Sequence, residues 1–172
     1  ISECLVGSEM CIRDRFNEGW GQFDAAAAAE YAHRLDPSRI IDHASGWHDQ
    51  GVSDVKSLHV YFKPYRFKPD KKGRAVVLSE FGGYNLPVAG HTWNAKNFGY
   101  KGYQTPEALG EAVKTLYETQ IVPACKSGLA ADVYTQLSDV EDEVNGFVTY
   151  DRRVEKLPEA LMRAIARELK GD

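Results

Sequence analysis

The amino-acid sequence predicts an α/β fold built on parallel strands. Short apolar segments alternate with helical patterns from Phe16 onward, and strands separated by helices form parallel sheets with right-handed crossovers. The segment Ala75 to Ser79 is a compact apolar run, which is typical of a parallel strand that is covered on both faces. The sequence shows neither an internal repeat nor a low-complexity linker.

The expected elements of the first half begin with an alanine-rich helix over Asp24 to Leu35. It ends before Asp36-Pro37, because the residue before a proline is pushed out of the helical region. Ile40-Ile41 follows as a short buried strand. Leu58 to Tyr61 is predicted to be another strand, which ends at the Lys63-Pro64 break.

The second half continues the alternation. Thr105-Pro106 supplies the N-cap and first residue of a long amphipathic helix, which runs to about Ser127 and ends at Gly128. Leu129 to Thr135 is expected to be a strand of mixed alternation. Leu157 to Leu169 is expected to be a helix, since its apolar residues recur every four positions.

The segment Ile1 to Arg15 shares neither period nor composition with the rest of the chain and holds Cys4 and Cys11. It resembles the translated sequencing-adapter peptide that contaminates some assembled reading frames. We interpret it as non-native and exclude it from the fold. The alternative is a short natural strand over Met10 to Ile12.

Composition limits the partners. A formal net charge of −4 without a basic stripe argues against nucleic acid as a partner, and no apolar run approaches the roughly 20 residues that span a bilayer. Beyond Arg15 the sequence has Cys125 as its only cysteine. It therefore predicts neither a disulfide framework nor a thiolate metal cluster, and it slightly favours a reducing compartment such as the cytoplasm.

Two glutamates stand at predicted strand ends. Asn17-Glu18 opens the native sequence immediately before a helix, and Glu80 follows the strand Ala75 to Ser79. Active sites of parallel barrels are built at the carboxyl ends of the strands. Glycoside hydrolysis needs two such carboxyl groups, one protonated and one ionised. Asn17 suits a sugar hydroxyl beside the reacting centre, and Gly82-Gly83 lets the following loop turn sharply.

Four separated motifs carry a family resemblance; in chain order they read FNEGWGQFD, DPSRIIDHASGWHD, VLSEFGGY and VYTQLSDVEDEVNGFVTYDRR. From Phe16 to about Arg167 the chain resembles the C-terminal domain of glycoside hydrolase family two, the group of β-galactosidases, β-glucuronidases and β-mannosidases. The resemblance implies a partial TIM (β/α)₈ barrel that comprises about strands four to eight. Residues 39–43, 58–61, 75–80 and 129–136 would then be strands five to eight. A complete barrel takes about 250 residues, against 172 here.

The resemblance also implies an activity. The full-length protein would hydrolyse terminal β-glycosidic bonds by double displacement, with galactosides as the first guess, Glu18 as acid/base, Glu80 as nucleophile and no cofactor. Retention needs the two carboxyl groups about 5 to 5.5 Å apart. A carbohydrate-binding barrel without turnover is the alternative. The fragment alone is expected to be unstable and inactive because its core is exposed, and a homo-oligomer in the full-length protein stays open.

Aromatic residues supply further candidates for substrate binding. Tyr61 matches a family tyrosine that hydrogen-bonds the nucleophile and the sugar, and His59 lies two residues earlier on the same strand face. For both, the alternative is a satisfied core side chain. Trp47 either lines the cleft or is buried in a turn.

The long loop Tyr84 to Gln104 carries Trp93 together with His91, Tyr100 and Tyr103. Aromatic rings suit the apolar face of a pyranose. The loop is therefore either a sugar-stacking platform around Trp93 or a segment that packs on itself.

An acidic run in the last motif raises the question of a metal; it consists of Asp139, Glu141, Asp142 and Glu143. No glycine-centred loop of the EF-hand type surrounds these residues. We prefer a solvated or structural loop. The histidines have no ligand spacing on one helix, and we predict no catalytic metal.

Overall fold

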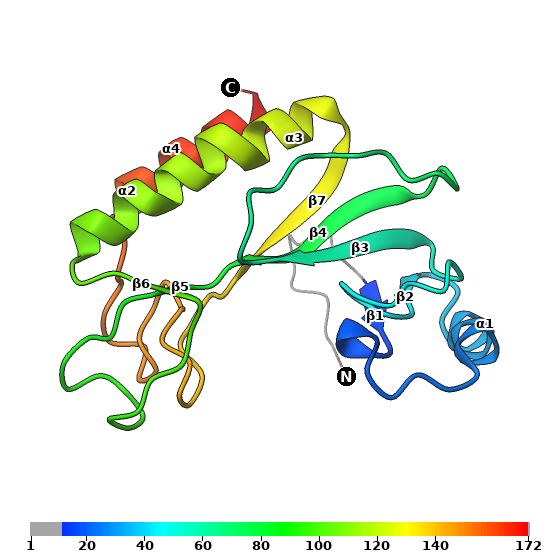
Figure 1. Ribbon diagram of the computed structural model, residues 1–172, viewed down its shortest axis with the longest axis horizontal. Helices are drawn as coiled ribbons and strands as arrows, with labels where there is room; N and C mark the ends of the chain where they lie inside the picture. Colours follow the sequence, from blue (N-terminus) through cyan, green and yellow to red (C-terminus); the bar gives the residue numbers. More distant parts are fainter. Residues whose placement is uncertain (1–11, 172) are drawn as a thin grey trace. The chain divides into compact units, whose positions relative to one another are not determined.

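The computed structural model describes residues 12–171, which form the mixed α/β fold expected from the alternation of strands and helices (Figure 1). The chain divides into two compact units. The first comprises the described residues up to His59 together with Lys68–Ser79, and the second comprises Val60–Phe67 together with the described residues from Glu80 onward. Among the helices so described, none is long and apolar enough to cross a bilayer.

In the first unit, β1 (Ile12–Asp14) pairs in parallel with β2 (Ile40–Asp42). Helix α1 (Ala25–Leu35) lies against β2, and Ala29 and Ala32 form a buried cluster with Ile41. Alanine side chains are small enough to let the helix approach the strand closely. The predicted helix and strand in this region are confirmed, but Ile40, which was expected to be buried, is 44% exposed.

Of the N-terminal segment, residues 1–11 lie outside the described residues, so the interpretation of Ile1 to Arg15 as non-native stays a prediction. The strand at Ile12–Asp14 overlaps the alternative strand, Met10 to Ile12, only at Ile12.

Strands β3 (Val55–Val60), β4 (Ala75–Gly82) and β7 (Leu129–Thr135) form one sheet with β4 in the middle. Val76, Val77 and Leu78 are all buried, as predicted for a strand that is covered on both faces. The prediction for β3 was wrong in its bounds, since β3 begins three residues before Leu58 and stops before Tyr61. Its first residues alternate between buried and half-buried positions, so they contain no apolar run.

The second unit contains the long predicted helix. Thr105 Oγ1 accepts a hydrogen bond from the backbone of Ala108 (3.2 Å), Pro106 opens α2 (Pro106–Leu116), and Gly128 ends α3 (Val122–Ser127) at a φ of 116°. Between them, Tyr117–Ile121 forms a wider π-type turn. It lies just before Pro123, which has no N–H to donate to the preceding turn.

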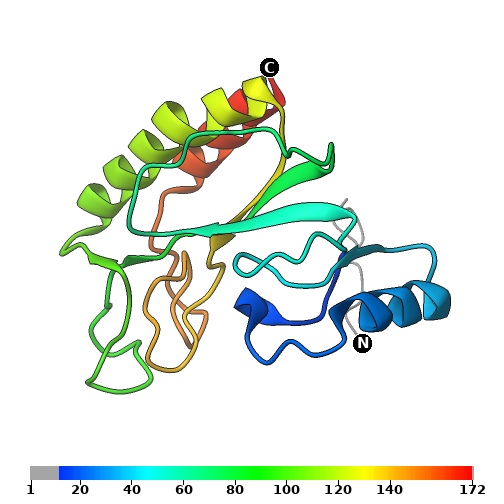
Figure 2. The ribbon, with the colours of Figure 1, turned by 45° about the vertical axis from the view of Figure 1, so that its right-hand side comes forward.

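The last helix, α4 (Glu159–Lys170), packs beside α2 and α3 (Figure 2). It begins two residues later than the predicted Leu157, because Pro158 stands at its N-cap with an extended backbone. Leu157 is nevertheless buried, as is Ile165. The apolar spacing therefore predicted the packed face correctly and the first residue of the helix incorrectly.

The region predicted as the loop Tyr84 to Gln104 contains a short parallel pair, β5 (Tyr84–Asn85) and β6 (Lys101–Gly102). The loop is tied to the segment after β7 by backbone hydrogen bonds, from Phe98 N to Asp142 O (2.6 Å) and from Leu86 N to Val144 O (3.1 Å). Two segments far apart in sequence are thus hydrogen-bonded to each other within the second unit.

Candidate active site

Glu80 lies near the carboxyl end of β4, in the second unit, where Tyr61 holds its carboxylate. The Tyr61 hydroxyl donates to Glu80 Oε2 at 2.5 Å and lies 3.1 Å from Thr135 Oγ1. Because the phenol has a single proton and directs it to Glu80, the Thr135 hydroxyl donates to the phenol oxygen. The predicted contact between Tyr61 and the nucleophile candidate is therefore present in the structure.

The Tyr61 hydroxyl is a permanent donor. Burial raises the pKa of Tyr61 far above its usual value, and the hydrogen bond to Glu80 raises it further. The phenol is therefore protonated at neutral pH. A fixed donor restricts the rotation of the Glu80 carboxylate and stabilises its charged form.

Two glycines follow Glu80 because neighbouring rings approach the backbone closely. Gly82 and Gly83 both have positive φ, 88° and 64°. A Cβ at Gly82 would lie 2.2 Å from the Tyr134 ring, and a Cβ at Gly83 would lie 2.2 Å from the Tyr100 ring. Glycine is the residue that adopts this left-handed backbone without strain, and the two glycines also make room for packed aromatic residues.

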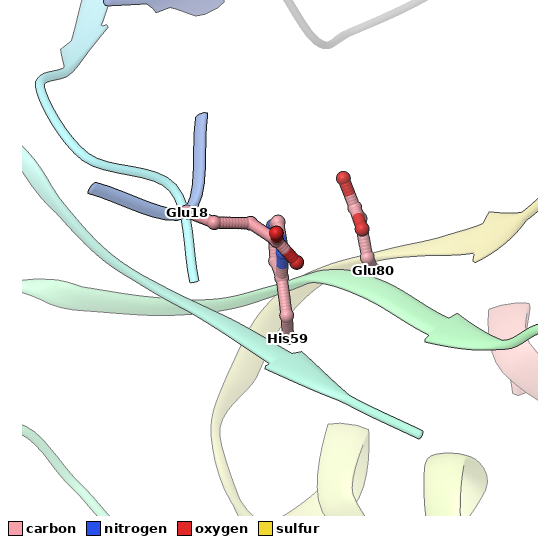
Figure 3. Close-up of side chains that lie close together, drawn as sticks. All are labelled: Glu18, His59 and Glu80. Atoms are coloured by element: carbon pink, nitrogen blue, oxygen red, sulfur yellow. The ribbon is translucent and has the colours of Figure 1, made fainter. Parts of the chain in front are cut away.

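Glu18 lies in the first unit, in the 3₁₀ turn Asn17–Gly19, with a φ of 55°. Its Oε1 is 3.3 Å from Nδ1 of His59, whose ring is buried on β3 (Figure 3). Gly46 passes so close to the His59 ring that a Cβ there would lie 2.2 Å from it. His59 is thus a core side chain that also orients Glu18.

Asn17 and Trp47 lie in the same unit. Asn17 Oδ1 accepts a hydrogen bond from Ser45 Oγ at 3.0 Å. The Trp47 ring lies 6.3 Å from the His59 ring and 6.3 Å from that of Trp20. Trp47 is 41% exposed and Trp20 is 65% exposed, so the alternative of a buried tryptophan was wrong. Trp20 was not singled out from the sequence, although it stands in the same motif as Glu18.

The Trp93 loop packs on a second loop of its own unit. Trp93 is 56% exposed and its ring centre lies 5.0 Å from that of Tyr150. His91 Nδ1 is 2.8 Å from Asp151 Oδ2, and this hydrogen bond is the main cause that lowers the pKa of Asp151 to about 2. Tyr150 was missed from the sequence, because its contact with Trp93 depends on the pairing of distant loops.

Three residues of the acidic run form contacts that hold their loop in place. Asp139 is buried and forms an ion pair with Lys156 at 2.6 Å. Glu143 accepts a hydrogen bond from Gln136 (2.7 Å), and Asp142 accepts one from Asn94. These contacts agree with the preferred interpretation, a structural loop.

The candidate residues thus form two groups. Glu18, His59, Asn17 and Trp47 belong to the first unit, whereas Glu80, Tyr61 and Trp93 belong to the second. The meeting of Glu18 and Glu80 in one cleft stays a prediction from the sequence.

No family model matches the chain, and no curated protein matches it by sequence. Among solved structures, Faecalibacterium prausnitzii β-glucuronidase is similar to it, with a TM-score of 0.56 and 15% sequence identity. The match covers 93% of this chain and 31% of the β-glucuronidase, so the chain spans less than a third of that protein. At this identity the likeness shows a common fold alone.

Proposed function

We propose that this chain is part of the catalytic barrel of a retaining β-glycosidase of glycoside hydrolase family two, with Glu80 as nucleophile and Glu18 as acid/base. The observation that carries the proposal is the carboxylate of Glu80 near the end of β4, held by the buried phenol of Tyr61 at 2.5 Å. Active sites of this fold lie at the carboxyl ends of its strands. The similarity in fold to a β-glucuronidase supports the proposal.

In the first step, Glu80 would attack the anomeric carbon while Glu18 gives its proton to the departing oxygen, so that a glycosyl ester of Glu80 forms. In the second step, Glu18 would remove a proton from water, which attacks the same carbon and releases Glu80. Two inversions leave the anomeric configuration unchanged. His59, which is 3.3 Å from Glu18, would keep this carboxyl group in place through both steps.

The activity is tested with nitrophenyl β-galactoside, β-glucuronide and β-mannoside and the full-length protein that contains this chain. We expect turnover of one of the three, with the β-galactoside as first guess, and NMR of the fresh product should show the β-anomer first. An initial α-anomer would contradict double displacement. A folded protein that binds these sugars without turnover would favour the carbohydrate-binding alternative. The 172-residue chain itself is expected to be inactive.

The role of Glu18 is tested by the leaving group. Glu18→Gln should slow hydrolysis of alkyl glycosides by about 10²- to 10⁴-fold, because their leaving oxygen needs a proton. Dinitrophenyl glycosides should lose far less in the glycosylation step, since dinitrophenolate leaves unprotonated. Steady-state kinetics on both substrate types measures the difference. An equal loss on both would exclude Glu18 as the acid, and Glu30→Gln, at an exposed helix position, is the control.

A further inference from the structure

The ring of Tyr61 is held from one side by a second tyrosine. Tyr100 stacks on it with 4.0 Å between ring centroids and 8° between the ring planes. Phe62 and Phe98 then meet the Tyr100 ring edge-on, at 5.1 Å and 5.7 Å. The phenol that holds Glu80 is therefore one member of a packed aromatic group within the second unit.

Backbone contacts on both sides of Tyr100 position its ring. Tyr100 N donates to Gly83 O at 3.3 Å, and the Gly83 position leaves no room for a Cβ beside the Tyr100 ring. The next residue, Lys101, pairs with Tyr84 in the β5–β6 ladder. On the other side, Phe98 is bound to the backbone of Asp142. The segment from Phe98 to Lys101, which carries Tyr100, is thus held by backbone contacts at both of its ends.

Tyr61 needs this support because of its own place in the chain. It is the first residue beyond β3, and Lys63-Pro64 follows shortly after it. β3 ends at Val60, so the stack with Tyr100 restrains the Tyr61 ring just beyond the strand. Misplacement of a catalytic group by about 1 Å costs about 10²-fold in rate.

We infer that Tyr100 is a positioning residue, which acts on Glu80 through Tyr61; the inference rests on the proposed function. It replaces the earlier hypothesis that Tyr100 belongs to a sugar-stacking platform. One face of its ring is covered by Tyr61, and two further rings pack against it. Tyr100 therefore contributes to the rate of the chemical step rather than to sugar affinity.

The test compares Tyr100→Leu and Tyr100→Phe in the full-length protein. Leucine removes the stack, and kcat should fall about 10- to 100-fold with KM nearly unchanged. Phenylalanine keeps the stack and should restore kcat to within about threefold of the wild type. The acid limb of the pH–rate profile should move upward with leucine, because a carboxylate that loses a donor ionises less readily.

A double-mutant cycle separates positioning from general stability. Tyr61→Phe removes the donor, so adding Tyr100→Leu to it should lower kcat by much less than Tyr100→Leu does alone. Losses that multiply independently would overturn the inference, as would a loss confined to KM. If Tyr100→Leu does not fold, Tyr100→His replaces it, because histidine keeps a flat ring. Its loss of kcat should be larger than that of Tyr100→Phe and smaller than that of Tyr61→Phe.

The two proposals fail in different ways. A wild-type protein without glycosidase turnover overturns the proposed function and the inference together. A wild type that is active, a Glu80→Gln variant that is inactive and a Tyr100→Leu variant with normal kcat would overturn the role of Tyr100 alone.

Discussion

Glu80→Gln should lower kcat of the full-length protein by about four to six orders of magnitude, because the amide cannot form the glycosyl ester. Glutamine has nearly the same shape as glutamate, and its amide oxygen can still accept the Tyr61 proton. The fold should therefore persist, with an unchanged circular dichroism spectrum and thermal midpoint. Turnover of the preferred nitrophenyl glycoside measures the loss.

A chemical rescue makes this result specific to the nucleophile. In Glu80→Ala, azide can occupy the space of the lost carboxylate and attack the anomeric carbon from the same face. A substrate with a good leaving group should then yield the α-glycosyl azide, which NMR identifies. Glu30→Gln, at an exposed position on α1, should keep wild-type turnover. Residual activity of Glu80→Gln above about 1% of wild type would assign the nucleophile elsewhere.

Most helices and strands were predicted correctly from residues close together in sequence. Thr105, Pro106 and Gly128 bound the long helix as expected, because caps depend on residues close together in sequence. The strand over Ala75 to Ser79 was likewise predicted from its apolar residues, of which Val76, Val77 and Leu78 are buried, but β4 continues to Gly82, beyond the predicted end. The first residues of β3 were missed, because Lys56 interrupts the apolar pattern on the less buried face.

For the candidate site, the residues could be predicted from the sequence, but their contacts could not. Glu80 was proposed from its place at a predicted strand end and from a family resemblance, and Tyr61 from the resemblance alone. No periodicity in the chain predicts that the two side chains meet. The stack of Tyr100 on Tyr61 and the contact of Trp93 with Tyr150 join segments far apart in sequence. Pairings of this kind depend on how loops are folded over one another, and a single sequence carries no local signal for them.

The contact between Lys156 and Asp139 is another pairing of distant residues that the sequence did not predict. It also leads to the largest expected effect on stability. Its Nζ donates to Asp139 Oδ1 at 2.6 Å and to Val144 O at 3.0 Å, while Gly146 N donates to the same Asp139 oxygen at 2.8 Å. The two side chains are 0% and 1% exposed. Burial raises the pKa of Asp139 and lowers that of Lys156, against the opposing pull of each partner. Each charge is thus stable only beside the other.

Lys156→Met should therefore destabilise the segment 136–156 by about 3 to 5 kcal/mol, because it leaves Asp139 buried without its partner. Adding Asp139→Asn removes the stranded charge and should recover much of that loss. Hydrogen–deuterium exchange of this segment in the full-length protein measures the local free energy of opening. Lys114→Met breaks a half-exposed pair with Glu118 and should cost less than about 1 kcal/mol.

The effect of Lys156→Met should also depend on pH with a definite sign. Without Lys156, the folded-state pKa of Asp139 rises further above its unfolded value, so the folded state binds the proton more tightly. Stability of the variant should then increase relative to wild type as the pH falls through that folded-state pKa, since protonated Asp139 is neutral. A loss that is independent of pH, or one that Asp139→Asn does not relieve, would show that lost packing of the lysine stem outweighs the stranded charge.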